Sequence, residues 1–433
     1  MNSILSTFLF RVFSFGSSLL DFHTFLENTP NVAFMYDRLV DSNMTAYRIA
    51  ILPGDGTGRE VMSEAQSLLD AISANSTLDF EQMEIPCGGQ YFLETGEEWP
   101  QGSFEKCRDE ADAILLGAIG WPDAVCENGD LAGGQVVLGL RAGLDLYANV
   151  RPIKLYEGVR HKVHGDFQQV WDAKKVNMVI VRENTEGLYH SLLHRSALKA
   201  TGGTEYEPPE MTFPGMNGDV AWDPRPISRA GSERVIKFAH RLVELRNGSP
   251  EGKNKLTCVD KSNVTRGCQL FRAIFEEKAA TWNGIETDYA YIDAFTMWLV
   301  RNPEWFDVVV TSNMFGDIAT DLGSVLQGGM GMAASGNIGD EHAFFEPVHG
   351  SSPKHAGKNI VNPIATLNSV QMMLEWLGHR NDDAEALKVA GFIDEAVAEH
   401  ILEGELLTYD LGGSASTSEV GSAIIERVVE KMS

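Results

Sequence analysis

Two carboxylates one helical turn apart suggest metal chemistry. Asp317 and Asp321 stand four residues apart in the segment FGDIATD, so a helix would place both on one face. Like charges at that spacing repel unless a cation lies between them, and oxygen ligands favour Mg²⁺ or Mn²⁺ over zinc. The segment follows the apolar run Asp307–Val310, so its helix would begin at the carboxyl end of a strand, where α/β proteins form their sites. The pattern favours a divalent-metal site over an exposed acidic face.

Three arginines near the ends of expected elements could bind a dicarboxylate. Arg141 and Arg151 lie on either side of AGLDLYANV, and Arg182 begins RENTEG at the end of another apolar run. The planar guanidinium group matches the geometry of a carboxylate. Taken singly, each arginine is better explained as a surface ion-pair partner, so the clamp interpretation depends on the three acting together.

Other polar residues also follow apolar runs. Lys261 follows Leu256–Val259 and could move protons if burial lowers its pKa, although alone it is better explained as a solvated loop residue. The loop Glu346–Pro353 could hold a phosphate or an adenine, or could merely turn the chain. The glycines of Gly54–Gly58 fit neither the dinucleotide fingerprint nor a P-loop, and favour a tight turn between a strand and a helix.

The elements that must position these residues alternate between strands and helices. Short apolar runs predict strands at Tyr47–Leu52, Ala113–Leu116, Met178–Val181, Leu256–Val259 and Asp307–Val310. Periodicity near 3.6 predicts helices at Glu60–Ile72, Glu233–Leu245 and Gln269–Glu277, with two more in the tail Asp382–Ser433. This alternation indicates a largely parallel α/β sheet. The Gly- and Pro-rich stretch Thr201–Arg229 is predicted to be a long loop or arm.

Length and composition exclude several classes of protein. The 433 residues fit two domains, and 61 acidic against 35 basic residues give a net charge of −26, which disfavours binding to nucleic acid or an acidic membrane surface. The five cysteines include no CxxC pair, so we expect neither a disulfide framework nor a zinc site. No apolar run reaches membrane-spanning length, so no membrane association is expected.

The first residues differ from the rest. We expect residues 1–43 to lie outside the fold, because Met44 immediately precedes the first predicted strand. The cysteine pattern favours a reducing compartment, and we expect a cytoplasmic protein. The alternative is an organellar location, if the Ser-rich and acid-free start is a transit peptide.

These pieces occur together in an order that resembles the isocitrate/isopropylmalate dehydrogenase family of β-decarboxylating dehydrogenases. The matching segments are LPGDGTG, LLGAIG, LRAGLDLYANVRP, VRENTEG with LY, VDKSNV, YIDA, VVVTSNMFGDIATDLGS, EPVHGSSPKHAGKNIVNP and DLGGSAST. The resemblance implies a two-domain α/β fold with a mostly parallel sheet that is not a Rossmann fold. It also implies a large cofactor-binding domain at 44–146 plus 329–433. A smaller domain at 147–328 would carry the substrate, metal and dimer elements.

The resemblance assigns roles to individual residues. Lys261 and Tyr189 would be the catalytic acid/base pair, and Arg141, Arg151 and Arg182 would clamp the malate part of the substrate. Asp293, Asp317 and Asp321 would hold Mg²⁺ or Mn²⁺. Lys261 and Asp293 would reach the site from a second subunit, which implies a homodimer with shared active sites. The residues expected to bind NAD or NADP are Glu346, His349, Gly350, Ser351, Lys354, His355 and Asn362.

The choice of substrate and cofactor depends on fewer residues. Val137 and Leu138 are apolar and suit the isopropyl group of 3-isopropylmalate, so we expect oxidative decarboxylation to 4-methyl-2-oxopentanoate, a step of leucine biosynthesis. The segments RENTEG and DLGGSAST resemble those of tartrate/D-malate dehydrogenase, which is the first alternative function. Isocitrate or homoisocitrate dehydrogenase is the next alternative, and a non-catalytic regulatory subunit is the last. Lys354 and His355 stand where members that use NAD have an aspartate, so NADP is expected to be accepted.

Overall fold

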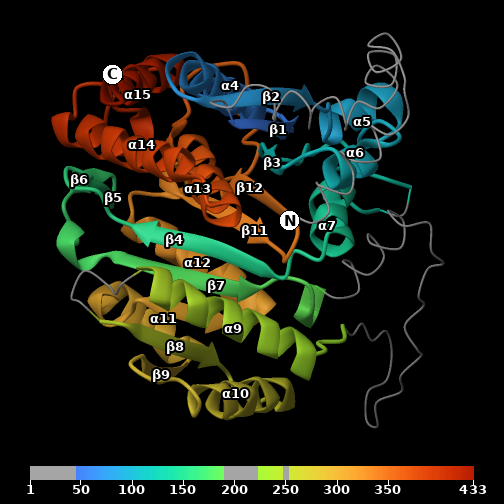
Figure 1. The fold of residues 1–433 in the computed structure, drawn as a ribbon, viewed down its shortest axis with the longest axis vertical. Coiled ribbons are helices and arrows are strands. Elements are labelled where there is room, and N and C mark those ends of the chain that lie inside the picture. The colour runs from blue at the N-terminus through green and yellow to red at the C-terminus, as the bar shows by residue number, and fades with distance from the viewer. Residues whose placement is uncertain (1–44, 128, 190–222, 247–252) are drawn as a thin grey trace, which may run out of the picture.

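The computed structural model describes residues 45–127, 129–189, 223–246 and 253–433 (Figure 1). A ten-stranded sheet runs through these residues in the order β2-β1-β3-β12-β11-β4-β7-β10-β8-β9. The N-terminal extension 1–43 and most of the predicted loop Thr201–Arg229 lie outside the described residues. The strands are β1 Thr45–Leu52, β2 Leu78–Glu84, β3 Ala113–Leu116, β4 Ala148–Lys154, β7 Asn177–Glu183, β8 Lys255–Asp260, β9 Glu286–Tyr291, β10 Val308–Thr311, β11 Ala334–Ile338 and β12 Ala343–Pro347.

The sheet is parallel in its outer parts and antiparallel at its centre. Strand β1 pairs in parallel with β2 and β3, and β10 does so with β7 and β8. At the centre, β11 is antiparallel to both β12 and β4, and β4 is antiparallel to β7. The prediction of a mostly parallel α/β sheet is confirmed. A separate hairpin pairs β5 His161–Val163 with β6 Asp166–Gln168.

Helices cover the sheet and bring its distant parts together. They are α4 Thr57–Asn75, α5 Gly89–Thr95, α6 Ser103–Asp109, α7 Gly134–Gly143, α9 Arg229–Arg246, α10 Arg266–Ala279, α11 Ile292–Arg301, α12 Asn313–Leu326, α13 Ile364–Asn381, α14 Ala384–Glu403 and α15 Thr417–Met432. Helices α13, α14, α15 and α4 pack beside one another at the upper end of the molecule in Figure 1. Helix α12 packs on β4 and β7. Within the described residues, none of the helices combines the length and apolar character needed to cross a membrane.

The predicted strands and helices are confirmed as elements, usually with longer bounds. Ala113–Leu116 is β3 itself, whereas Glu60–Ile72 forms the middle of α4. The tail contains α14 and α15, as predicted. The sequence prediction missed β4 and β11, both of which carry polar residues at alternating positions. The domain boundaries stay a prediction. The predicted large domain, 44–146 with 329–433, contains the first half of the strand order, β2-β1-β3-β12-β11. The predicted small domain, 147–328, contains the second half, β4-β7-β10-β8-β9.

The glycine segment after β1 is a tight turn, as predicted. The buried carboxylate of Asp55 accepts hydrogen bonds from the backbone N–H groups of Gly89, Gln90 and Gly120, each 2.8 Å long. Gly54 has a φ of 72°, and a Cβ there would lie 2.3 Å from the carbonyl oxygen of Ala118. Only glycine fits so close an approach.

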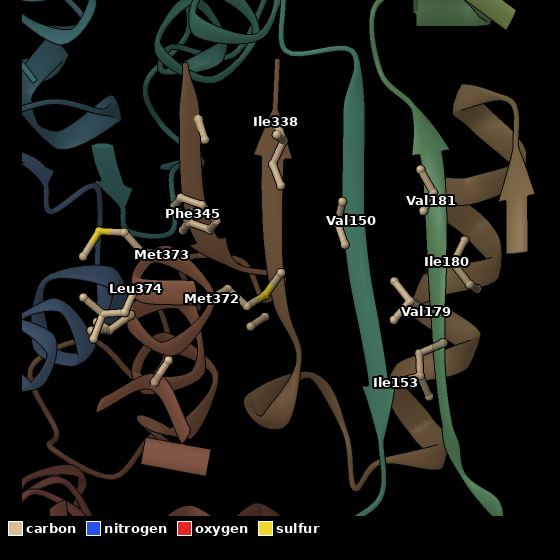
Figure 2. Packing of buried hydrophobic residues seen from close by; sticks show 14 of the residues in the cluster. Val150, Ile153, Val179, Ile180, Val181, Ile338, Phe345, Met372, Met373 and Leu374 are labelled. Atoms are coloured by element: carbon tan, nitrogen blue, oxygen red, sulfur yellow. The ribbon is translucent and has the colours of Figure 1, made fainter. Parts of the chain in front are cut away.

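Along β4, at the centre of the sheet, apolar and polar side chains alternate between the two faces. Val150 of β4, Val181 of β7 and Ile338 of β11 belong to the hydrophobic core and lie on neighbouring strands (Figure 2). Side chains alternate between the two faces along a strand, so Asn149 and Arg151, on either side of Val150, point to the opposite face. That polar face carries the candidate site.

Candidate functional site

A buried arginine pair holds the first metal candidate. Arg182, at the end of β7, forms an ion pair through Nη1 with Oδ1 of Asp317 on α12. Nη2 of Arg151, on β4, lies 3.5 Å from the same oxygen. Arg182 also donates to Oδ1 of Asn313 from Nε and Nη2, at 3.1 and 2.7 Å. Two predicted substrate ligands and one predicted metal ligand therefore share one small space.

Opposing effects set the charges of the groups in this cluster. Burial raises the pKa of Asp317, but Arg182, Arg151 and the hydrogen bond from Tyr189 outweigh it and hold this pKa below its usual range. Burial together with repulsion from Arg151 lowers the pKa of Arg182 to about 9, despite the attraction of Asp317. Asp317 is thus ionised at neutral pH, and Arg182 remains mostly charged.

The second carboxylate lies one turn further along α12. Oδ1 of Asp321 is 3.7 Å from Nη1 of Arg151, and the Asp321 side chain is about half exposed. Burial, with the nearby charge of Asp317, raises the pKa of Asp321 although Arg151 opposes the shift. The prediction that the two carboxylates share a helix is confirmed, and their oxygens are the donors that Mg²⁺ and Mn²⁺ favour.

The predicted acid lies within reach of this cluster. Tyr189, in the 3₁₀ turn Gly187–Tyr189, donates its hydroxyl to Oδ2 of Asp317 at 3.0 Å. Its ring lies 5.5 Å from the guanidinium carbon of Arg182. Burial, and then the charge and hydrogen bond of Asp317, raise the pKa of Tyr189 above its usual value. The phenol is therefore protonated at neutral pH, the state that a proton donor requires.

The third arginine joins the site from helix α7. Nη2 of Arg141 lies 2.9 Å from Oε1 of Glu346 on β12. Nε of Arg141 is buried and has no hydrogen-bond partner among the described residues, which fits a site that binds an acidic ligand. Val137 and Leu138 stand one turn earlier on α7 and are partly buried. Glu346, which the sequence places with the cofactor residues, thus contacts an arginine that is predicted to bind the substrate.

Sequence reasoning missed the buried amides that connect these groups. Three asparagine side chains are at most 1% exposed. They are Asn149 on β4, Asn184 after β7 and Asn337 on β11. Asn337 accepts from the side-chain amides of Asn149 at 2.8 Å and of Asn184 at 2.9 Å. The alternation of polar and apolar residues in ANVRPIK and ASGNI was the signal that would have found two of them.

The other predicted catalytic groups lie together at a different place. Nζ of Lys261, after β8, is 2.5 Å from Oδ1 of Asp293, in the first turn of α11. Within the described residues, neither side chain forms a hydrogen bond or ion pair with Asp317 or Asp321. Likewise, the described part of one chain contains no group of three His, Cys, Asp or Glu side chains that could hold a metal ion. One chain alone therefore does not bring the three predicted metal ligands together.

The predicted cofactor loop lines a pocket of about 220 Å³. His349, Gly350 and Asn362 contribute to its wall, with Tyr409 and Asp410 from the C-terminal part of the chain. Nε2 of His349 is buried without a hydrogen-bond partner among the described residues, and burial lowers the pKa of this imidazole. A pocket lined by a neutral imidazole with an unpaired ring nitrogen suits a polar ligand.

The remaining residues of this loop have different surroundings. Ser351 anchors the loop to the turn after β1, since its carbonyl oxygen accepts from the N–H and the hydroxyl of Thr57 at 2.9 and 3.0 Å. His355 stacks on Tyr409 with ring centroids 5.6 Å apart. Lys354 is exposed, and the described residues provide no ion-pair partner for it. Its amine is free to meet an anionic group of a ligand.

The chain is similar to proteins of known type over most of its length. The family model described as isocitrate/isopropylmalate dehydrogenase matches residues 48–424. The 3-isopropylmalate dehydrogenase of Thermobifida fusca is 38% identical over 388 residues, covering 89% of this chain and 98% of that protein. The homoisocitrate dehydrogenase of Methanocaldococcus jannaschii is 36% identical over 389 residues, covering 89% and 99%. The crystal structure of isocitrate dehydrogenase from Methylococcus capsulatus superposes with a TM-score of 0.71 at 32% identity, covering 88% and 99%.

Proposed function

The chain belongs to the isocitrate/isopropylmalate dehydrogenase family, and we propose that it oxidatively decarboxylates 3-isopropylmalate to 4-methyl-2-oxopentanoate with NAD or NADP. The observation that carries this proposal is the meeting of Arg141, Arg151 and Arg182 with Asp317 and Tyr189 on one face of the sheet. Several of the most similar relatives are 3-isopropylmalate dehydrogenases at 36–38% identity, which supports the same assignment.

The arginines would hold the malate part of the substrate. Their guanidinium groups are nearly buried, and a charged pair in such a place is stronger than one in water. Val137 and Leu138, on the helix that carries Arg141, would contact the isopropyl group. A substrate whose carboxylates bind Arg151 and Arg182 competes with Asp317 for them, which frees the carboxylate of Asp317 for a cation.

The chain's own residues would handle two protons. Lys261 would take the proton of the C2 hydroxyl as the C2 hydride leaves, and Tyr189 would give its proton to C3 after CO₂ has departed. Asp317, with Asp321, would hold a divalent cation, which supplies Lewis-acid stabilisation of the negative charge on the C2 oxygen. The dinucleotide, held by the loop that contains His349, supplies the hydride acceptor.

We propose that a second copy of the chain completes the site. Helices α11 and α12 pack side by side, and each exposes apolar side chains on the face that also carries a predicted metal ligand. Met297 and Val300 follow Asp293 on α11, and Ile318 and Val325 flank Asp321 on α12. An exposed apolar stripe on two adjacent helices favours a two-fold interface. Such an interface would carry Lys261 and Asp293 of one copy to the arginine cluster of the other.

The cofactor would occupy the pocket beside His349 and Asn362. The buried, unpartnered Nε2 of His349 fits a polar ligand there. The exposed amine of Lys354 would attract a ribose 2′-phosphate and has no acceptor for a 2′-hydroxyl. We therefore propose that NADP is accepted at least as well as NAD.

A second candidate substrate class deserves the same assay. RENTEG, with its buried Asn184, resembles the segment of tartrate/D-malate and isocitrate enzymes, and a homoisocitrate dehydrogenase is among the close relatives. A regulatory, non-catalytic role is disfavoured, because Lys261, Tyr189 and the three aspartates are all present.

The test is a matrix of initial rates. The purified protein would be assayed with 3-isopropylmalate, D-malate, tartrate and isocitrate, each with NAD and NADP and with Mg²⁺ or excess EDTA. We expect the highest kcat/KM for 3-isopropylmalate and loss of activity in EDTA. Preference for another acid would replace the proposed substrate, and full activity in EDTA would exclude the metal site.

A further inference from the structure

A line of buried hydrogen bonds connects two of the arginines to the carboxylate beside the cofactor loop. Arg151 donates from Nε to Oδ1 of Asn149 at 2.8 Å, and Asn149 donates from Nδ2 to Oδ1 of Asn337 at 2.8 Å. Asn337 donates from Nδ2 to Oε1 of Glu346 at 2.9 Å, and this oxygen also accepts from Arg141 at 2.9 Å. The line crosses β4, β11 and β12, where the two parts of the chain that form the sheet meet.

Charge fixes the direction of every bond in this line. The carboxylate of Glu346 only accepts, so Asn337 must turn its NH₂ group towards it. The Asn337 oxygen then faces Asn149, which must donate, and the oxygen of Asn149 is left for the Arg151 guanidinium. Both asparagines are fully buried, where hydrogen bonds in series polarise one another and an unmade bond is costly.

The strand register makes this line a direct connection across the sheet. Asn337 and Asn149 are opposite each other in the β11–β4 pair, and Asn149 is opposite Arg182 in the β4–β7 pair. A movement of Arg151 towards a bound carboxylate changes the bond that Asn149 accepts. The change reaches Glu346 through the buried amide of Asn337.

We infer that Asn337 is a positioning residue that couples dicarboxylate binding at Arg151 to dinucleotide binding next to Glu346. The inference rests on the proposed function, because it takes the arginines as substrate ligands. It predicts that the two ligands bind cooperatively and that the cooperativity depends on the bond from Asn337 to Glu346.

The experiment compares variants that keep the packing but change this bond. Asn337→Leu has nearly the same size, but its side chain donates nothing to Glu346 and accepts nothing from Asn149. Asn337→Ser is a smaller second variant. Ser335→Ala is the matched control, because Ser335 is equally buried on the same face of β11 and accepts from Asn149 at 3.1 Å, but lies off the line.

Calorimetry would give the Kd of NADPH with and without saturating 3-isopropylmalate and Mg²⁺, a combination that cannot turn over. The ratio of the two Kd values is the coupling factor, which commonly amounts to about 5- to 150-fold and must be the same when measured from the substrate side. We expect the ratio to fall at least about fivefold, towards 1, in both Asn337 variants and to stay within about twofold of wild type in Ser335→Ala.

Two kinds of failure can be told apart. A wild type that turns over another dicarboxylate overturns the proposed substrate, and the same cycle is then run with that acid. A wild type that turns over its acid but binds the two ligands independently overturns the coupling inference alone. Coupling that persists in either folded Asn337 variant, or that Ser335→Ala loses equally, also overturns it.

Discussion

Neutralising each of the two α12 carboxylates separates their roles in folding from their roles in catalysis. Both Asp317→Asn and Asp321→Asn should lose nearly all turnover, since each removes a proposed cation ligand and charge stabilisation at such sites is worth several kcal/mol. Only Asp317→Asn should also lose stability. Asp317 is the counter-charge of Arg182 and Arg151, which are 3% and 9% exposed as side chains.

The size of the stability loss follows from the exposure of the two partners. Removing one partner of a fully buried ion pair costs roughly 3–5 kcal/mol. Asp317 is 35% exposed, and Arg182 keeps its bonds to Asn313, so solvent screening reduces the cost to about 2 kcal/mol. Asp321 is 52% exposed and 3.7 Å from Arg151, and its neutralisation should change stability by no more than about 0.5 kcal/mol.

Urea unfolding in EDTA measures this difference, because divalent cations then cannot compensate for either change. The midpoint of Asp317→Asn should lie well below that of wild type, and that of Asp321→Asn should lie close to it. Equal stability of Asp317→Asn and wild type would refute the assignment of Asp317 as the arginines' counter-charge. An equal loss in both variants would point to damage to α12 rather than to a lost ion pair.

Three further outcomes are expected. Lys261→Met should slow hydride transfer by about 10²–10⁴-fold and Tyr189→Phe should slow a later step, so a normal stopped-flow burst of reduced cofactor in Lys261→Met would contradict the assignment. Lys354→Asp should shift the kcat/KM ratio towards NAD by about fivefold, since a partly exposed charge pair is worth on the order of 1 kcal/mol, and an unchanged ratio would show that Lys354 does not face the ribose. Burial, the largest cause, raises the pKa of Glu183 from 4.5 to about 7. Its contribution to folding is therefore fully present below pH 4.5, and about 3 kcal/mol is lost as the pH rises to about 7. If the stability of Glu183→Gln fell with rising pH as steeply as that of wild type, this prediction would be contradicted.

The sequence was sufficient for the elements that obey a simple period. The spacing of Asp317 and Asp321 predicted one helical face, and α12 has both residues on it. The apolar runs predicted β3, β7, β8 and β10 because these strands are buried on both faces. Spacing alone did not bring Arg141 to Glu346, which is 205 residues away in the chain. Such a contact depends on the strand order, which a local pattern does not contain.

Two other features of the site could not be predicted from local sequence patterns, for different reasons. Lys261 is paired with Asp293, and within the described residues neither forms a hydrogen bond or ion pair with Asp317 or Asp321. Their proposed meeting with Asp317 therefore involves a second chain. The amides were missed because asparagine is usually a turn or surface residue, and burial of an amide is tolerated only when specific partners satisfy it.

Strand β4 combines a regular alternation of apolar and polar residues with the pairing that buried polar groups need. Its alternation places Val150 in the core, while Asn149 and Arg151 lie on the buried polar face. A polar face inside a protein is costly unless its groups are paired, because each unmade bond costs about 1–3 kcal/mol. Asn149, Asn337 and Arg151 meet this condition through one another. Nε of Arg141 and Oδ1 of Asn184 do not meet it within the described residues. Both atoms belong to side chains of the same polar network, since Arg141 donates to Glu346 and Asn184 donates to Asn337. The network therefore contains one donor and one acceptor that the described residues leave unpaired, and both are costly to keep buried.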